Sequence, residues 1–140
     1  MNLERAIEIA VESHKGQTDK ADAIYILHPL RVMMSLATDE ERTAGILHDV
    51  VEDSDWSFER LSDEGFSDEI IDALRCLTKI DGEDYEDFIM RVCVNPLARR
   101  VKVADVKDNM DLSRIESPSE EDFKRLEKYK RALGVLEMQD

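Results

Sequence analysis

Two adjacent residues, His48 and Asp49, are followed one helical turn later by a second acidic pair, Glu52 and Asp53. Imidazole and carboxylate groups together suit divalent ions such as manganese, iron or zinc. A carboxylate beside such an ion can position or deprotonate a water molecule whose pKa the ion has lowered. This segment therefore predicts a divalent-metal site with two acids available to handle water, and it indicates hydrolysis of a phosphoester.

Two more candidate ligands, His28 and Asp105, lie far from this segment in the sequence. Asp105 has the apolar neighbours Val101 and Val103, where a buried carboxylate needs a counter-charge. Each candidate alone also fits a structural explanation, such as a surface acid or a helix end, since short motifs match often by chance. Together they include two of the three histidines in the chain. The predicted ligands are His28, His48, Asp49 and Asp105.

Composition limits the class of protein. The chain has 140 residues, 42% hydrophobic and 37% charged, which is typical of one globular domain spanning 1–140. The net charge of −14 argues against binding of nucleic-acid polymers or anionic membranes. Cys76 and Cys93 form no CxxC pair and indicate a reducing compartment. With no signal peptide and no membrane-spanning apolar run, we expect a cytoplasmic protein.

Apolar residues recur at helical spacing along nearly the whole chain, and no segment alternates as a strand would. The pattern predicts an all-α domain. One helix is expected to begin at the capping box of Thr38 and Glu41 and to carry His48 and Asp49. Pro29 is expected to open the helix before it. The helices are expected over 2–14, 29–37, 38–53, 57–64, 67–77, 85–92, 96–105 and 119–138.

On one continuous helix, neighbouring side chains point about 100° apart. His48 and Asp49 could then share an ion only near the helix surface between them. The four-residue spacing places Glu52 on the face of His48 and Asp53 on the face of Asp49. Both acids are therefore expected within one turn of the metal.

The apolar stripes also predict which side chains fill the core. Methionine is a flexible filler of irregular gaps, so the methionines near the motifs are expected inside. The expected methionines are Met33, Met34, Met90 and Met110. The last helix is expected to bury Phe123, Leu126, Leu133 and Leu136. We expect the third histidine, His14, to be a packed residue or a favourable helix-end charge rather than a ligand.

Taken in order, the motifs resemble those of the HD-domain hydrolases of the Rel/SpoT type, and most closely the stand-alone small alarmone hydrolases. The likeness runs from about His14 to Leu112. Its motifs are Tyr25-Ile26-Leu27-His28-Pro29, Leu47-His48-Asp49-Val50-Val51-Glu52-Asp53, Leu77-Thr78, and Val101-Lys102-Val103-Ala104-Asp105 with Asn109.

The resemblance implies an all-α HD fold with a single Mn²⁺, held by His28, His48, Asp49 and Asp105. It implies that Glu52 and Asp53 handle the attacking water and that Asn109 contacts the ribose. The implied reaction removes the 3′-pyrophosphate of guanosine tetra- or pentaphosphate by metal-activated water. The resemblance also makes a homo-oligomer plausible.

The chain departs from that family where phosphate would bind. After Gly16-Gln17-Thr18 the family has a basic residue, whereas this chain has Asp19 followed by Lys20. After Asn109-Met110 the family often has arginine, whereas this chain has Asp111, with Arg114 as a candidate replacement. A lysine or arginine is more often a solvated surface charge than a ligand contact. The candidates for phosphate contact are Lys15, Lys20, Arg31, Lys102, Lys107 and Arg114.

Two alternatives to alarmone hydrolysis remain open. The same metal chemistry could act on another nucleotide or phosphoester, as the changes at Asp19 and Asp111 suggest. The chain could instead be a sensor module that binds metal or nucleotide without turnover. The complete Glu52 and Asp53 pair argues against a sensor, since a non-catalytic relative has less need of water-handling acids.

Overall fold

The computed structural model describes residues 2–138, and the elements within this range are helices. The only β pairing found among these residues is an isolated antiparallel bridge between Thr18 and Ile24. The all-α prediction is therefore confirmed. In chain order the helices are α1 (Leu3–Ser13), α2 (Leu27–Met34), α3 (Asp39–Leu47), α4 (Val50–Asp53), α5 (Phe58–Asp63), α6 (Asp68–Leu77), α7 (Tyr85–Cys93), α8 (Pro96–Asn109) and α9 (Glu120–Glu137).

Most of these helices begin at a side chain that accepts a hydrogen bond from the first turn, which satisfies a backbone donor that has no partner within the helix. The predicted capping box is present. The Thr38 side chain accepts a hydrogen bond from the Glu41 backbone N–H, and the Glu41 side chain accepts one from the Thr38 backbone N–H. Ser119 and Asp122 form a second capping box, at the start of α9. Local sequence thus fixes where most helices start.

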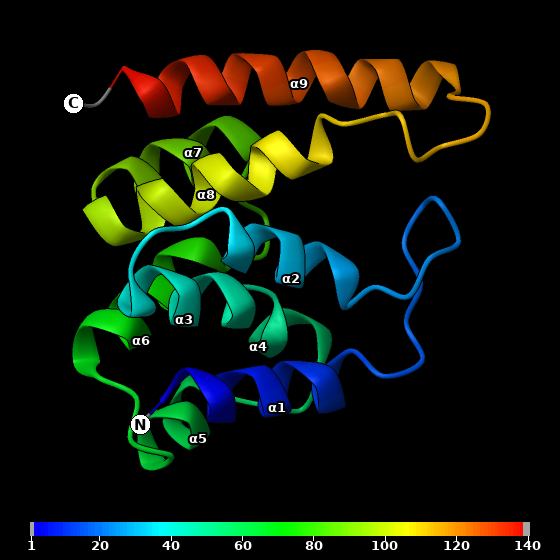
Figure 1. Ribbon diagram of the computed structural model, residues 1–140. Helices are drawn as coiled ribbons and strands as arrows, with labels where there is room; N and C mark the ends of the chain where they lie inside the picture. Colours follow the sequence, from blue (N-terminus) through cyan, green and yellow to red (C-terminus); the bar gives the residue numbers. More distant parts are fainter. Residues whose placement is uncertain (1, 139–140) are drawn as a thin grey trace.

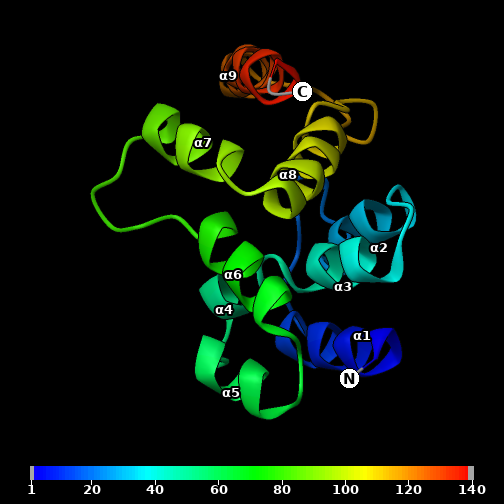
Figure 2. The ribbon, with the colours of Figure 1, turned by 90° about the vertical axis from the view of Figure 1, so that its left-hand side faces the viewer.

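Helix α3 lies at the centre of the molecule, between α1, α2, α6 and α8 (Figures 1 and 2). Its residues Thr43 to Leu47 are buried without interruption. Helix α9 packs across α7 and α8 at the opposite end from α1 and α5 (Figure 1). The helix that ends at the His48 motif is therefore the one the core surrounds most completely.

A close approach between α2 and α3 depends on Gly45. A Cβ atom at this position would lie 2.8 Å from Leu36 Cδ1 and 3.4 Å from Val32 Cγ1. Glycine lets the two helices pack closely where their functional residues must meet.

Several predicted helix boundaries are wrong: α8, expected over 96–105, continues to Asn109, and two further errors fall at the His28 and His48 motifs. The expected helix 38–53 is interrupted: α3 ends at Leu47, Asp49 has φ −107° and ψ 0°, and α4 begins at Val50. Helix α2 begins at Leu27, so His28 lies in its first turn and Pro29 occupies its third position. Proline is tolerated there because the first turn of a helix has no intrahelical acceptor for its N–H.

Several predicted core residues lie at the surface. Met34 is 70% exposed and Met90 55% exposed, whereas Met33 is buried as expected. Phe123 is 52% exposed, although Leu136 on the same helix is fully buried. Helix α9 packs mainly against α7 and α8, so a narrower part of its apolar stripe is buried than the sequence suggests.

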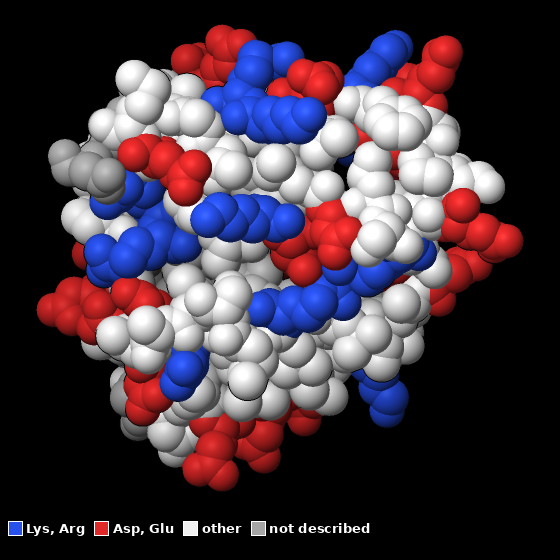
Figure 3. Space-filling view, turned by 45° about the horizontal axis from the view of Figure 1, so that its top comes forward, with Lys and Arg blue, Asp and Glu red and all other residues white. Residues whose placement is uncertain are grey.

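Within residues 2–138, no helix combines the length and the apolar character needed to cross a membrane. On the face seen in Figure 3, basic and acidic side chains are interspersed.

Candidate metal centre and adjoining pocket

Three of the predicted ligands converge at one point. His28, His48 and Asp49 each offer a ligand atom, and these atoms lie within 4.8 Å of one another. The Nε2 atom of His48 lies 3.0 Å from Asp49 Oδ2. Neighbours on a continuous helix would point about 100° apart, so the interruption between α3 and α4 is what brings these two side chains together.

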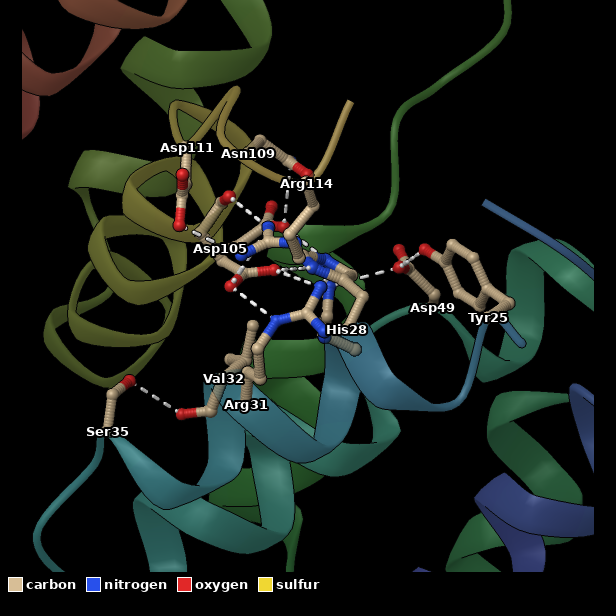
Figure 4. A network of polar contacts seen from close by, with 12 residues as sticks. Tyr25, His28, Arg31, Val32, Ser35, Asp49, Asp105, Asn109, Asp111 and Arg114 are labelled. Carbon is tan, nitrogen blue, oxygen red and sulfur yellow. Dashed lines mark hydrogen bonds and ion pairs between the residues drawn. The ribbon is translucent and has the colours of Figure 1, made fainter. Parts of the chain in front are cut away.

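The fourth predicted ligand, Asp105, reaches the same point from α8 (Figure 4). Its Oδ1 atom lies 2.8 Å from His28 Nε2 and 3.4 Å from His48 Nε2. Its Oδ2 atom accepts a hydrogen bond of 2.9 Å from Lys102 Nζ, and Asn109 donates to Oδ1 at 3.2 Å. Asp105 is only 4% exposed, so these contacts supply the counter-charge that the sequence called for.

The Nε2 atom of His48 tests whether these groups suit a metal ion. It is buried and makes no hydrogen bond, although two carboxylates lie within 3.4 Å. The other ring nitrogen, Nδ1, lies 2.6 Å from the backbone oxygen of Gly45 and is positioned to donate to it. Buried polar atoms normally have a partner. An imidazole nitrogen without one, facing carboxylates, fits a divalent cation.

The charges in the centre stabilise one another. Burial raises the pKa of Asp49, but the neighbouring His48 outweighs burial and lowers that pKa to about 2. Burial likewise raises the pKa of Asp105, and Lys102 and His48 outweigh it, so that this pKa lies well below the usual range. Both carboxylates are thus ionised while a protonated His48 and Lys102 serve as their counter-charges, and a divalent ion would replace the His48 proton in that role.

Tyr25 is a site residue that the sequence analysis did not single out. Its hydroxyl donates a hydrogen bond to Asp49 Oδ2 (Figure 4). Its ring packs between His14 and His28, at centroid distances of 4.9 and 5.7 Å. His14 is buried with its Nδ1 atom 2.9 Å from Gln17 Oε1, in agreement with the interpretation as a packed residue. The position of Tyr25 in the first motif was the available signal.

Glu52 and Asp53, the predicted water-handling acids, occupy α4 directly beyond the centre and are exposed. Partial burial, followed by the negative charge of Asp49, raises the pKa of both carboxyl groups. The backbone oxygen of Asp53 accepts a hydrogen bond from Gln17 at 3.1 Å. This contact attaches α4 to the segment after α1, so the acids are held beside the centre.

Asp108 is a second residue that the sequence analysis missed. Its Oδ2 atom lies 2.7 Å from His28 Nδ1, and Arg31 donates to both of its carboxylate oxygens, at 2.7 and 3.0 Å. Burial raises the pKa of Asp108, but His28 and Arg31 outweigh it and hold that pKa far below its usual value. Its spacing of one helical turn from Asp105 on α8 was the available signal.

A cavity of about 350 Å³ adjoins the centre between α2, the end of α8 and α9. Four of the predicted substrate contacts line it: Lys20, Arg31, Asn109 and Arg114. Lys102 instead lies against Asp105, with 12% of its side chain exposed, and Lys15 is exposed and outside the lining.

The arginines of this cavity are paired with acids. Arg31 contacts Asp108, and Arg114 contacts both Asp108 and Asp111. Two further lining residues come from α9, Arg125 and Tyr129, and Arg125 pairs with Asp122. The cavity can therefore offer cations to a phosphate only where they are not already neutralised by these carboxylates.

No family model matches the chain. It is 32% identical over 120 residues to a guanosine-3′,5′-bis(diphosphate) 3′-pyrophosphohydrolase of Aquifex aeolicus, a match that covers 77% of this chain and 17% of that protein. It is 33% identical over 147 residues to a probable GTP pyrophosphokinase of Mycobacterium leprae, covering 96% of this chain and 18% of that protein. The chain is homologous to the hydrolase domain of RelA/SpoT proteins. It spans less than a fifth of the length of these two relatives.

A solved structure supports the same relationship at the level of fold. A metazoan ortholog of SpoT that hydrolyses ppGpp matches with a TM-score of 0.76 at 21% identity. The match covers 96% of this chain and 84% of that one. The likeness to the Rel/SpoT family, predicted from the motifs, and the all-helical fold, predicted from the apolar spacing, are thus confirmed.

Proposed function

We propose that this chain is a metal-dependent phosphohydrolase that removes the 3′-pyrophosphate of guanosine tetra- or pentaphosphate, with 1–140 as its hydrolase domain. The observation that carries the proposal is the convergence of His28, His48 and Asp49, with the unpartnered His48 Nε2 among carboxylates. The Aquifex aeolicus relative, which its name describes as such a hydrolase, supports this choice of reaction.

The ion we propose is Mn²⁺, with Asp105 completing the ligand set. When bound, such an ion lowers the pKa of a water molecule and offsets negative charge on the phosphate. Lys102 and Asn109 hold the Asp105 carboxylate, and the Tyr25 hydroxyl holds that of Asp49. These contacts orient the ligands before substrate arrives.

The remaining roles fall to residues around the centre. Glu52 and Asp53 position the attacking water and accept its proton, and their exposure lets the proton pass on to solvent. The nucleotide occupies the cavity beside the centre, where Lys20, Asn109 and Arg114 contact it. The partners that we propose are the nucleotide substrate, the metal ion and a second copy of this chain. Light scattering, which measures the mass of the particle in solution, tests the self-association.

A second candidate keeps the metal chemistry and changes the substrate to another nucleotide or phosphoester. The specific observation behind it is the pairing of Arg31, Arg114 and Arg125 with acids in the cavity. A less basic cavity favours a substrate with less phosphate charge than guanosine pentaphosphate.

Product analysis separates these candidates. The Mn²⁺-loaded protein is incubated with guanosine tetraphosphate and, in parallel, with a panel of other nucleoside phosphates. We expect pyrophosphate and guanosine diphosphate, and chelator should abolish their release. Turnover of another panel member alone would support the second candidate. Metal and nucleotide binding without any turnover would identify a sensor module and contradict both.

A further inference from the structure

The contacts of Asp108 extend the proposed centre. We infer that Asp108 is a positioning residue for His28, and that Arg31 and Arg114 hold it in that role; this inference rests on the proposed metal site. A histidine that binds a metal usually donates its second ring N–H to a carboxylate or carbonyl, which fixes its tautomer and orientation. Asp108 is placed to be that carboxylate.

Both ring nitrogens of His28 face acids. Nε2 lies 2.8 Å from Asp105 Oδ1, inside the centre, and Nδ1 lies 2.7 Å from Asp108 Oδ2, outside it. A carboxylate can only accept, so Asp108 keeps the proton on Nδ1. The lone pair of Nε2 is then directed to the ligand position.

Helices α2 and α8 supply both the proposed ligands and the residues that support them. His28 and Arg31 are one turn apart on α2, and Asp105 and Asp108 are one turn apart on α8. Each residue of the first pair contacts its counterpart on the other helix, and Asp108 accepts from His28 and Arg31 together. Packing α2 against α8 therefore aligns the ligand and its support in one step.

Asp108 is itself restrained. Arg31 binds it through Nε at 2.7 Å and Nη2 at 3.0 Å, the bidentate geometry that fixes a carboxylate plane. Arg114 Nη2 donates to the Asp108 backbone oxygen at 3.0 Å and lies 3.5 Å from Oδ1. With 11% of its side chain exposed, Asp108 has little freedom to turn away from His28.

Manganese affinity and the His28 ring proton test this inference. We would compare the wild type with Asp108→Ala by calorimetric titration of Mn²⁺, and record the imidazole N–H signals of the Zn²⁺-loaded proteins by NMR. Loss of such a contact costs about 10- to 100-fold in metal affinity, and we expect Asp108→Ala to show it. The Nδ1–H signal of His28, protected in the wild type, should be lost to exchange with water.

Graded variants separate positioning from simple support of the fold. Asp108→Asn keeps an oxygen that can accept from Nδ1–H and should recover part of the lost affinity. Arg31→Gln leaves Asp108 in place and should weaken Mn²⁺ binding less than Asp108→Ala does. Glu83→Gln is the matched control, because Glu83 takes a bidentate pair from Arg91 without touching a predicted ligand. It should bind Mn²⁺ as the wild type does.

The outcomes distinguish this inference from the proposed function. A wild type that binds Mn²⁺ while Asp108→Ala shows the same affinity and the same protected Nδ1–H overturns the role of Asp108 alone. A wild type that binds neither Mn²⁺ nor Zn²⁺ overturns the metal site and this inference with it. Equal weakening in Asp108→Ala and Glu83→Gln would mean a general loss of stability and would also contradict positioning.

Discussion

The two histidines of the centre are held in opposite ways. The second ring nitrogen of His48 faces the backbone oxygen of Gly45, three residues earlier in the same chain segment. That of His28 faces Asp108, on a helix 80 residues further along the sequence. One proposed ligand, His48, is thus positioned by its own turn, whereas the other, His28, depends on the packing of α2 against α8.

The acids follow the same division. Asp105 is held by Lys102 and Asn109 of its own helix, while Asp49 is held by Tyr25, 24 residues earlier. The pair His48 and Asp49 therefore combines a residue held locally with one held by a distant contact, and so does the pair Asp105 and His28. Changes to a local support should act mostly on stability, and changes to a distant support mostly on the geometry of the ligands.

The largest effect is expected from removing a ligand on the local side. His48→Ala should abolish stoichiometric metal binding and all turnover, because a buried ligand nitrogen is lost. A ligand at 100 times its Kd stabilises the folded state by about 2.7 kcal/mol, so the variant should also lose the rise in melting temperature that Mn²⁺ gives the wild type. Elemental analysis that finds one full equivalent of metal would contradict this prediction.

The second-largest effect is expected from a change that leaves all four proposed ligands and their supporting contacts in place. Glu52→Gln with Asp53→Asn removes the proposed water-handling groups and keeps the ligands. General acid–base catalysis contributes about 10²- to 10⁴-fold, and we expect a loss of turnover in this range with unchanged Mn²⁺ titration. Surviving activity would show that these acids do not handle the water. Glu4→Gln with Glu12→Gln, which neutralises two exposed acids on α1, serves as the charge-matched control.

Removing the local support of Asp105 on α8 is expected to lower the stability of the protein more than its metal affinity. Lys102→Met removes the ammonium from the buried Asp105, and breaking a buried pair costs about 3–5 kcal/mol. Because Mn²⁺ supplies positive charge at the same carboxylate, saturating metal should restore part of the loss. Urea unfolding with chelator and with Mn²⁺ measures both quantities. Equal destabilisation in the two conditions would place Asp105 outside the metal site.

The smallest effect is expected where the local support is backbone. In Gly45→Ala the added methyl meets Leu36 Cδ1, at an overpacking cost of about 1–3 kcal/mol. Higher helix propensity offsets about 1 kcal/mol of this cost, so thermal unfolding should show a modest net destabilisation. Mn²⁺ affinity should not change, since the carbonyl that faces His48 remains.

A control for this change lies in α9. Gly134→Ala meets no atom within 4 Å and should stabilise the protein by about 1 kcal/mol through propensity alone. A tenfold loss of Mn²⁺ affinity in Gly45→Ala would show instead that the spacing between α2 and α3 places His48.

The division between local and distant contacts also explains where prediction from the sequence succeeded. The capping box lies at Thr38 as expected, and the helices expected from 57 and 67 begin at the caps Ser57 and Ser67, because a cap involves residues within one turn. Residue type and motif order predicted the convergence of His28, His48 and Asp49. Tyr25 and Asp108 were missed, because a tyrosine or an aspartate shows its partner only when distant segments meet.

The amino-acid sequence by itself determined the helical fold, most helix starts and the residues able to bind a divalent ion. Only the tertiary structure decided the interruption between α3 and α4, the exposure of Met34 and Phe123, and the pairing of His28 with Asp108. The physical reason is range. Caps and apolar periodicity act within a few residues, whereas burial and hydrogen bonding between helices depend on which surfaces pack together.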